Sequence, residues 1–579
     1  MESRTFQVLE FPKILGALSG FAVSEAGVSA CLELHPYDNL NGVRKAATLF
    51  EQAAAWVGES GFQIKSFPEL DGLFTYLDRP IGVLDQDGLF ALKQVLDIAR
   101  TSRDSLKQYE DRSWDVLWKS LFSYEWPAKT ISAIGRCLDQ EGHIKDESSP
   151  GLSSVRQEIR SIHQRCTKRV KDFVIQENMG QAMQDEYMTI SSDRYVLPIK
   201  ANFKNKTKGI IHDYSQTGET CYFEPMFLVE TNNRLQELKR EEREEEYKVL
   251  TYLTDLVRQE QRGVFEAYVG QVNLDVLMAK VKLANQYDGR AIDVVESGEP
   301  KLLKARHPLL ALADNSVQPL NIELLEGQKA LIVSGGNAGG KTVCLKTIGL
   351  IGLMTLAGLP VPAAEGSSLP FWTEIFVVMG DEQSLEENVS TFTAQIQYLK
   401  RVWGDVGNQT LFILDEFGAG TDPTQGAALA QAVIDSLVEC DATTFIATHF
   451  PALKAYAMAT DSVRAASVLF DPSTKKPLYK LAYDQVGASI ALDVAREHGL
   501  PTHILKRAEQ YLLLDGSDTT SVLDRLNDMA VKRENELEAV AIERAKLEQK
   551  RAKLEVNFEK ERTKLLSEIQ TQAQTVVKQ

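Results

Sequence analysis

Hydrophobic and polar positions alternate at helical spacing from residue 1 to about residue 150. In segments such as 11–18 and 84–98, apolar side chains recur three or four positions apart, which places them on one face of a helix. We therefore expect an all-α domain over 1–150. A break at 147–152 follows, and a long charged helix is expected to start with Ser153 or Ser154 as N-cap and to end near Glu177.

The spacing changes from 3.6 to 2 between residues 187 and 225. Short runs of β-forming residues at 187–190, 195–200, 208–213 and 220–224 lie between turn residues, which predicts a small antiparallel sheet. Helical spacing then resumes, and one or two long charged helices are expected from Phe227 to about Tyr287. A β-tip between two long helices predicts that 151–290 is an arm that runs out, turns and returns.

Buried apolar strands alternate with helices over 291–515. Strand-like runs at 375–379, 410–414 and 443–447 follow an earlier run that ends at residue 334, and this order predicts a mainly parallel sheet. Residues 489–513 resemble a helix-turn-helix, for which packing or dimer contact is favoured over DNA recognition because the second helix is strongly apolar. Residues 516–579 form a charged helical tail with a weak heptad pattern. The predicted fold class is multidomain α plus α/β.

The apolar run 330–334 leads into a glycine-rich loop that is followed by a helix. Gly335, Gly340, Lys341 and Thr342 fit G-x-x-x-x-G-K-[ST], and the loop between them contains Gly336, Asn337, Ala338 and Gly339. In this pattern backbone N–H groups cradle phosphates, the lysine reaches the β/γ-phosphates and the hydroxyl binds Mg²⁺. A plain glycine-rich turn is the alternative, but the strand before the loop and the helix after it favour a nucleotide site.

Two adjacent carboxylates follow the strand-like run 411–414. Asp415 and Glu416 are expected at the carboxyl edge of the sheet, where open α/β sheets bind ligands. Asp415 is expected to hold Mg²⁺, and Glu416 to orient and deprotonate the attacking water. His449 ends the next strand and is expected to sense the γ-phosphate, in preference to a histidine that only ends a strand.

A further segment carries a helix start near this chemistry. Residues 387–398 run from a polar loop into an amphipathic helix whose N-cap is Ser390 or Thr391, and the positive end of a helix dipole suits a γ-phosphate. The turn 418–423 after the two carboxylates is suited to line a dimer seam.

Composition and charge narrow the choice of partners. The 579 residues imply two to four domains, and neither a signal peptide nor a membrane-spanning run is apparent. With six scattered cysteines, a cytoplasmic location is expected. Because the net charge is −17, nucleic-acid binding needs a local basic patch. The candidates are Lys200, Lys204, Lys206 and Lys208, and the alternative is a solvated, lysine-rich hairpin edge.

These motifs together resemble the MutS superfamily of ABC-type ATPases. The resemblance is strongest to its second bacterial branch, the type II proteins that lack the mismatch-reading domain, and it rests on 334–349, 380–384, 390–392, 414–423, 447–449, 194–200 and 212–218. It implies a helical core over 1–150, levers with a clamp tip over 151–290, an ATPase domain over 291–515 and a tail over 516–579. It also implies ATP and Mg²⁺, and a homodimer with two composite sites. Ser390 would meet the partner's nucleotide, while Lys341, Thr342, Asp415, Glu416 and His449 would act on their own.

Two departures from the family pattern limit what is carried over. Gly336 stands where the family usually has proline, which loosens the loop. The chain shows neither the small β-domain nor the nuclease-like small MutS-related domain that usually follows the tail helix, so the sequence does not support an endonuclease activity.

The targets implied by the branch are stalled or collided ribosomes, with their rRNA, or branched and recombining DNA. The ribosome is slightly favoured, because the tip is lysine-rich without base-reading features. A nucleotide-gated scaffold that does not hydrolyse ATP is the alternative function.

Overall fold

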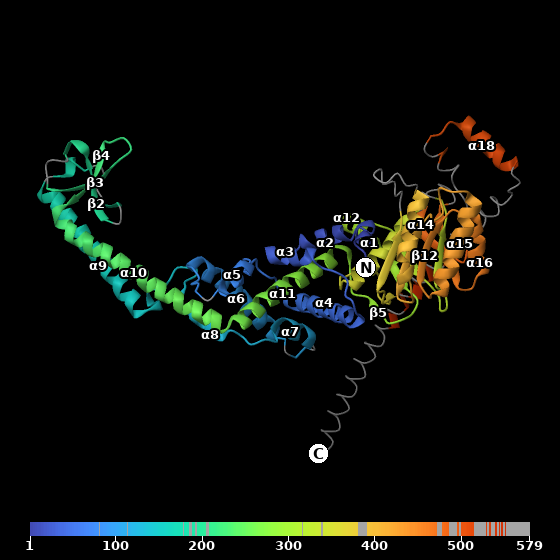
Figure 1. Ribbon diagram of the computed structural model, residues 1–579, viewed down its shortest axis with the longest axis horizontal. Helices are drawn as coiled ribbons and strands as arrows, with labels where there is room; N and C mark the ends of the chain where they lie inside the picture. Colours follow the sequence, from blue (N-terminus) through green and yellow to red (C-terminus); the bar gives the residue numbers. More distant parts are fainter. Residues whose placement is uncertain are drawn as a thin grey trace, which may run out of the picture. The chain divides into compact units, whose positions relative to one another are not determined.

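The computed structural model describes residues 1–514, except 80, 110, 113, 178, 184–187, 192–193, 204–207, 315, 337–339, 380–390, 472–476, 486–494 and 497–498, and some helical residues between 529 and 551 (Figure 1). The chain forms two compact units. The first contains Met1–Phe21, Cys31–Ala54 and Ala279–Gln579, and the second contains Ala22–Ala30 and Ala55–Met278. The division into four regions that we expect from the sequence is a different partition and stays a prediction.

The described residues of 1–150 form helices and contain no β-strand, as the apolar spacing predicts. The helices are α1 (Ser3–Val8), α2 (Phe11–Ser19), α3 (Glu25–Leu32), α4 (Leu40–Ser60), α5 (Asp71–Leu77), α6 (Gln86–Lys107), α7 (Asp115–Phe122), α8 (Ala128–Cys137) and the short η1 (Asp146–Ser148). In α6, Asp85 caps the first turn by accepting from the Gly88 N–H, and Leu89, Leu92 and Leu96 are buried on one face. Among the described helices, none combines the length and the apolarity that crossing a bilayer requires.

Two long helices of the second unit run side by side. They are α9 (Pro150–Gln176) and α10 (Met226–Gln259), and α11 (Gln261–Tyr287) follows α10 (Figure 1). Arg156 links the pair, since its guanidinium donates to Glu242 at 2.8 Å and to Glu246 at 2.6 Å. The long helical segment that is expected from Phe227 to about Tyr287 is therefore present as two helices, α10 and α11.

The start of α9 differs from the prediction of Ser153 or Ser154 as its cap. The Ser149 side chain accepts from the Leu152 N–H at 3.0 Å, and Pro150 occupies the first helical turn. Proline suits that position because its ring presets φ and its missing N–H would have no helical partner. The predicted cap is wrong by one turn, because Pro150 begins the helix and does not belong to the break before it.

A four-stranded antiparallel sheet lies at the end of the α9–α10 pair and confirms the change of spacing seen in the sequence (Figure 1). Its strands are β1 (Thr189–Ser191), β2 (Arg194–Lys200), β3 (Gly209–Tyr214) and β4 (Thr220–Pro225), in the order β1-β2-β4-β3. The short η2 (Met179–Gln181) precedes β1, and η3 (Ala201–Phe203) follows β2. Leu197 and Phe223 pack with Leu228 of α10 in the core of this β-tip.

A buried carboxylate ties the β-tip to α10. Glu224 has an exposed fraction of 0% and accepts from Arg194 at 2.9 Å and from Asn232 at 2.7 Å, with His212 as a third partner. Burial opposes ionisation, but the hydrogen bonds from Arg194, Asn232 and His212 hold the pKa of Glu224 below its ordinary value. The network therefore stabilises the β-tip while the carboxyl group is ionised.

Replacing Glu224 with glutamine is expected to destabilise β2 and β4 by about 3 kcal/mol at pH 7, because it breaks a buried ion pair. Since the pKa of Glu224 is depressed in the folded chain, its stabilisation is complete above the ordinary value of about 4.5 and disappears as the pH falls through the folded value. Hydrogen exchange of the β2 and β4 amides measures both effects. The exposed Glu219→Gln is the control, and a difference that did not shrink at all as the pH is lowered would contradict the assignment.

A six-stranded sheet forms the centre of the first unit. Its strands are β8 (Ala330–Ser334), β10 (Glu374–Val378), β11 (Thr410–Asp415), β12 (Thr443–Thr448), β13 (Val463–Phe470) and β14 (Pro477–Tyr483), in the order β10-β11-β12-β8-β13-β14. All neighbours pair in parallel except β13 and β14. The predicted mainly parallel sheet is confirmed. The strands β8, β10, β11, β12 and β13 are almost entirely buried, which explains their continuous apolar sequences.

Helices and a smaller sheet complete the first unit. The helices are α12 (Pro308–Ala313), α13 (Lys341–Leu356), α14 (Thr391–Val402), η5 (Trp403–Asp405), α15 (Pro423–Glu439), α16 (Pro451–Ala459) and α18 (Thr502–Leu514). The smaller sheet contains β5 (Asp293–Val295), β6 (Lys301–Ala305), β7 (Leu320–Glu323) and β9 (Ser368–Pro370). Most of the first helix of the predicted helix-turn-helix and most of the tail lie outside the described residues.

The N-terminal helices belong to the first unit. The Thr5 hydroxyl in α1 donates to the carbonyl of Ile375 in β10 at 2.8 Å. Glu10 accepts from Lys346 of α13 at 3.1 Å. Phe11 and Ile14 of α2 are buried. The sequence pattern predicts these helices but not their position against the sheet.

Candidate nucleotide-binding site

The central strand β8 ends in the predicted phosphate loop. All five residues of β8 are buried, and the strand lies between β12 and β13. Gly335 and Gly340 have φ values of 137° and 87°, conformations that favour glycine. Gly340 is the N-cap of α13, so the loop leads to a helix N-terminus that suits an anion. Gly336 is described, whereas Asn337, Ala338 and Gly339 lie outside the described residues.

Lys341 is held in the first turn of α13. Its exposed fraction is 3%, and its ammonium group donates to the carbonyl of Gly335 at 2.8 Å. Burial lowers the pKa of Lys341, while the nearby carboxylates of Glu416 and Asp415 act in the opposite direction. The ammonium group of Lys341 is thus held beside Gly335, the first residue of the phosphate loop.

Thr342 and Asp415 meet directly. The Thr342 hydroxyl donates to Oδ2 of Asp415 at 2.7 Å. The other oxygen, Oδ1, is buried and has no hydrogen-bond partner among the described residues. Burial raises the pKa of Asp415, and the hydrogen bond from Thr342 opposes that shift. A hydroxyl beside a carboxylate with an unused buried oxygen fits a hard cation such as Mg²⁺.

Glu416 and His449 lie at the same edge of the sheet. Asp415 and Ala447 are partners in the β11–β12 register, and the Glu416 N–H donates to the carbonyl of Ala447 at 3.0 Å. The carboxylate of Glu416 lies 3.8 Å from Nδ1 of His449. Their side chains are 35% and 49% exposed, so both reach solvent on the side where the phosphates of a bound nucleotide would lie.

The backbone of Glu416 is strained. Its φ is 51°, in the left-handed region that costs a side chain with a Cβ atom on the order of 1 kcal/mol or more. Strain of this kind persists where neighbouring contacts fix the conformation, and the N–H of Glu416 is fixed by β12. The conformation directs the carboxylate away from the strand and beside His449.

An apolar cavity that the sequence analysis missed adjoins the phosphate loop. It measures about 380 Å³ and is lined in part by Gly340, Val343, Val468 and Tyr479. A Cβ atom built on Gly340 would lie 3.1 Å from the ring of Tyr479, so the ring rests against the loop. Tyr479 has a φ of 52°. The only sequence signal was an aromatic residue in the run that forms β14.

His307 also lines this cavity. Burial lowers the pKa of His307 to about 4, against an opposing effect of Glu10, so the ring is neutral at pH 7. Its Nδ1 atom is buried without a hydrogen-bond partner among the described residues. The cavity thus combines apolar walls, one aromatic ring and one unused polar atom, as pockets for planar heterocycles do.

The predicted dimer segments are described in part. Ser390 lies outside the described residues, and α14 begins at the next position. In the turn 418–423, Asp422 caps α15 by accepting from the N–H groups of Thr424 at 3.1 Å and Gln425 at 3.0 Å. This turn is therefore a structured helix start. Its role at a dimer seam stays a prediction.

The structure separates two of the lysines that are close in sequence. Lys200 pairs with Thr220 at one end of β4, whereas Gly209, next to Lys208, pairs with Pro225 at the other end. At about 3.4 Å per residue the two ends are about 17 Å apart. Lys204 and Lys206 lie outside the described residues. Lys200 and Lys208 therefore do not form one patch, and their contact with nucleic acid stays a prediction.

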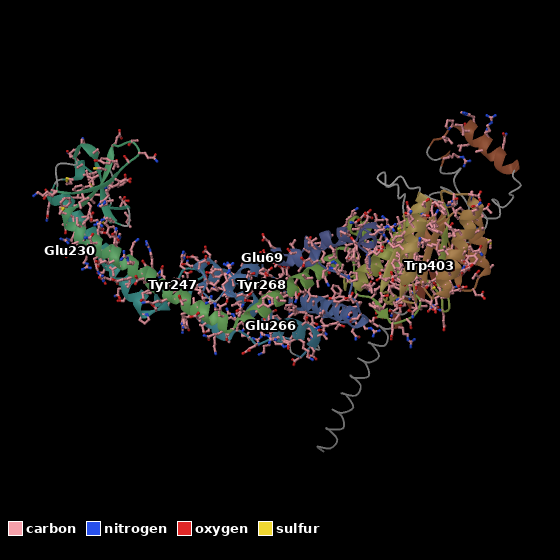
Figure 2. The ribbon with its side chains drawn as sticks, viewed as in Figure 1. Glu69, Glu230, Tyr247, Glu266, Tyr268 and Trp403 are labelled. Atoms are coloured by element: carbon pink, nitrogen blue, oxygen red, sulfur yellow. The ribbon has the colours of Figure 1, made fainter. Side chains whose placement is uncertain are left out.

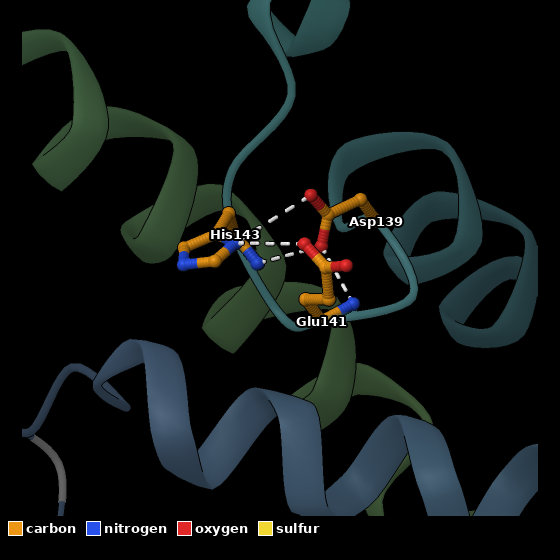
Figure 3. Close-up of side chains that lie close together, drawn as sticks. All are labelled: Asp139, Glu141 and His143. Atoms are coloured by element: carbon orange, nitrogen blue, oxygen red, sulfur yellow. Dashed lines mark hydrogen bonds and ion pairs between the residues drawn. The ribbon is translucent and has the colours of Figure 1, made fainter.

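A second group of possible metal ligands lies on the surface of the second unit. Figure 3 shows Asp139, Glu141 and His143 in one turn. Asp139 accepts from the backbone N–H groups of Glu141 and His143, both at 2.9 Å. Desolvation opposes ionisation, but these hydrogen bonds, from His143 and then Glu141, hold the pKa of Asp139 below its ordinary value. The carboxylate thus closes the turn, which accounts for the cluster without a metal.

The chain is similar in sequence to proteins of one family. Residues 331–514 match the family model described as MutS domain V. The protein named Endonuclease MutS2 of Maridesulfovibrio salexigens is 59% identical over the whole chain, which covers 75% of that relative. The namesake of Solidesulfovibrio magneticus is 54% identical with the same coverage. That of Halothermothrix orenii is 34% identical over 99% of the chain and 73% of the relative. The chain therefore belongs to the MutS family, in its MutS2 branch.

Proposed function

We propose that the chain is an ATP-binding and ATP-hydrolysing clamp that acts as a homodimer on a nucleic-acid assembly. One observation carries the proposal: Lys341, the Thr342–Asp415 pair and the Glu416–His449 pair converge on one edge of the sheet. A cation, a metal-ligand pair and a carboxylate with access to water are the groups that phosphoryl transfer to water needs.

Each residue at this edge of the sheet has a different role in the reaction. The N-terminus of α13 and Lys341 bind the triphosphate. Thr342 and Asp415 would hold Mg²⁺, which when bound neutralises charge on the phosphate oxygens. Glu416 accepts a proton from water as its oxygen attacks the γ-phosphorus, and the bond to the β-γ bridging oxygen breaks to give ADP, phosphate and a proton. His449 hydrogen-bonds to the γ-phosphate.

The apolar cavity takes the base of the nucleotide. Tyr479 offers a ring for stacking, and His307 offers a polar atom. Replacing Tyr479 with alanine is expected to weaken ATP binding about 10-fold, because base–aromatic stacking contributes about 1–3 kcal/mol. Isothermal titration measures the loss. Tripolyphosphate, which has no base, is the control ligand, and an equal loss for both ligands would contradict this assignment.

A second copy completes the site. Glu416 and His449 are partly exposed, so water reaches the phosphate side of a single chain, and a second surface there would exclude it. Ser390 at the start of α14 is our candidate for the contact with the partner's nucleotide. The second copy is expected to join when ATP binds.

The long helices carry nucleotide-driven movement to the β-tip. In this scheme residues 1–150 form the core and residues 151–290 form the levers and the clamp. Residues 291–515 form the ATPase domain, and residues 516–579 form the tail. The protein is placed in the cytoplasm. The target is a stalled or collided ribosome, or else branched or recombining DNA. We favour the ribosome because the sequence of the β-tip is rich in lysine and carries no base-reading motif.

One experiment tests the assembly and its target together. The Glu416→Gln variant is mixed with lysate and ATP, recovered, and its bound nucleic acid is sequenced, while sedimentation velocity reports its mass with and without ATP. An ATP-dependent dimer that carries rRNA or DNA supports the proposal. A monomer under every condition contradicts the composite site, and a dimer without nucleic acid favours the alternative, a nucleotide-gated scaffold.

A further inference from the structure

The helix α14 contacts the turn that carries Glu416. Oε1 of Gln395, in the second turn of α14, accepts from the N–H of Gly418 at 3.4 Å. Gln395 has an exposed fraction of 3%. Gly418 follows Glu416 by two residues and is buried as well. One side chain of α14 thus reaches the backbone of the turn from which the carboxylate of Glu416 projects.

The conformation of the turn 416–418 depends on this acceptor. Its backbone has positive φ at both ends, 51° at Glu416 and 85° at Gly418. A carbonyl of β12 accepts from the N–H of Glu416, whereas the N–H of Gly418 donates to a side chain. A buried N–H that loses its acceptor pays the cost of desolvation. Replacing the side chain at position 395 is therefore expected to disturb the turn and the carboxylate that it carries.

The turn is packed closely between α14 and α15. A Cβ atom built on Gly418 would lie 2.8 Å from the carbonyl oxygen of Gly426, in the first turn of α15. Phe417 is 2% exposed and belongs to the apolar core that also contains Tyr398 and Leu399 of α14. Close-packed groups transmit displacements because they have little free space around them. A shift of α14 therefore moves the turn and Glu416 with it.

The outer side of α14 has room for such a shift. A groove of about 360 Å³ lies between α14 and α15, with Leu399 and Val433 among the residues that line it. Trp403 follows the end of α14 directly and is exposed (Figure 2). The start of α14 follows Ser390, which the proposed function assigns to the partner's nucleotide. The helix thus connects that contact to the turn of Glu416.

We propose that Gln395 is a positioning residue for hydrolysis: by accepting from the N–H of Gly418, it directs the carboxylate of Glu416 toward the attacking water. This inference rests on the proposed function and adds a residue that does not touch the nucleotide. Residues 391 and 395 are about 6 Å apart along the helix, at about 1.5 Å per residue. Contact of the start of α14 with the partner's nucleotide therefore acts on Glu416 across about one helical turn.

The test replaces Gln395 with methionine, which keeps the length of the side chain but lacks the amide oxygen. Turnover at saturating ATP is expected to fall about 10-fold, because the loss of one buried acceptor corresponds to a factor of about ten. The affinity for ATP should stay within about twofold, since Gln395 lies neither in the phosphate loop nor in the lining of the apolar cavity. Phosphate release measures turnover, and titration with a fluorescent ATP analogue measures affinity.

Three comparisons separate positioning from a general effect on the fold. Gln397→Met makes the same replacement at an exposed position of α14 and should behave as the wild type does. Gln395→Glu keeps an acceptor oxygen in either protonation state, so its turnover should return to within about threefold of the wild type. In the Glu416→Gln background, Gln395→Met should cause no further loss of single-turnover hydrolysis, because the carboxylate that it positions is absent.

The outcomes distinguish the inference from the proposed function. If the wild type hydrolyses ATP no faster than Glu416→Gln, the ATPase proposal fails and the inference fails with it. If the wild type hydrolyses ATP and Gln395→Met loses no more turnover than Gln397→Met, the positioning role is wrong while the ATPase proposal stands. Equal losses of turnover and affinity, or an equal loss in the Glu416→Gln background, also overturn the positioning role. A loss of turnover alone, reversed by Gln395→Glu, supports it.

All rates are compared well below the melting temperature of each variant. Gln395→Met removes a buried hydrogen bond and should melt at a lower temperature than Gln397→Met. The retained affinity for ATP shows that the phosphate loop of the variant is folded. A variant that bound no ATP at any temperature would contradict the inference, because Gln395 would then be needed for the binding fold itself.

Discussion

Replacing Glu416 with glutamine is expected to lower the rate of ATP hydrolysis at least about 100-fold while ATP binding is kept. General-base catalysis contributes about 10²–10⁴-fold, and the amide cannot accept the proton. The substitution removes a negative charge near Lys341, which Glu416 helps to stabilise as a cation, but it leaves the phosphate loop unchanged. Phosphate release under saturating ATP measures the rate, and ADP titration measures binding.

The control for this prediction is a carboxylate outside the site. Glu439 is exposed at the end of α15, and Glu439→Gln makes the same replacement there, so its turnover should remain close to that of the wild type. Wild-type turnover no faster than that of Glu416→Gln would contradict the ATPase proposal and support the scaffold. Equal loss of ADP binding and of turnover would show that Glu416 serves binding.

Replacing Lys341 with alanine or methionine is expected to weaken ATP binding by about 100-fold or more. Loss of a buried, charge-assisted contact costs about 2–5 kcal/mol, and each 1.4 kcal/mol is a factor of ten. Alanine also opens a cavity, because Lys341 is buried, whereas methionine keeps most of the apolar stem. Titration with a fluorescent ATP analogue measures both variants.

The neighbouring lysine of α13 provides the matched control. Lys346 lies on the same helix and pairs with Glu10 at 3.1 Å, so Lys346→Met removes an equal charge away from the loop. Its effect on ATP affinity should be below about fivefold, since a partly exposed pair contributes at most about 1 kcal/mol. Equal losses for Lys341→Met and Lys346→Met would assign the effect to net charge.

The sequence predicts the phosphate side of the site because the relevant signals are local. An apolar run, a glycine-rich loop and a helix follow one another around Lys341, and each carboxylate or histidine follows a strand. Parallel strands bring their carboxyl ends to one edge, so Asp415, Glu416 and His449 could be assigned together before any coordinates. The carboxylate of Glu416 and Nδ1 of His449 lie 3.8 Å apart at that edge.

The base side of the site could not be predicted in the same way. Tyr479 reaches Gly340 only because β13 and β14 lie beyond β8 in the sheet order. No local pattern encodes that order. For the lysines of the β-tip, closeness in sequence does not predict closeness in space. Lys200 and Lys208 are close in sequence, but the chain crosses the length of the sheet between them.

The hydrogen bond from Thr5 to Ile375 restricts how the chain can fold while it is being synthesised. Its two ends are 370 residues apart, and at about 5–20 residues per second a ribosome needs roughly 20–70 s to synthesise the intervening chain. During that interval α1 and α2 have left the exit tunnel, but the strand against which they rest does not yet exist. Contacts of such long range also close slowly. The apolar face of α2 is thus available to chaperones early in translation, and the first unit can complete its core only after β10 has been synthesised.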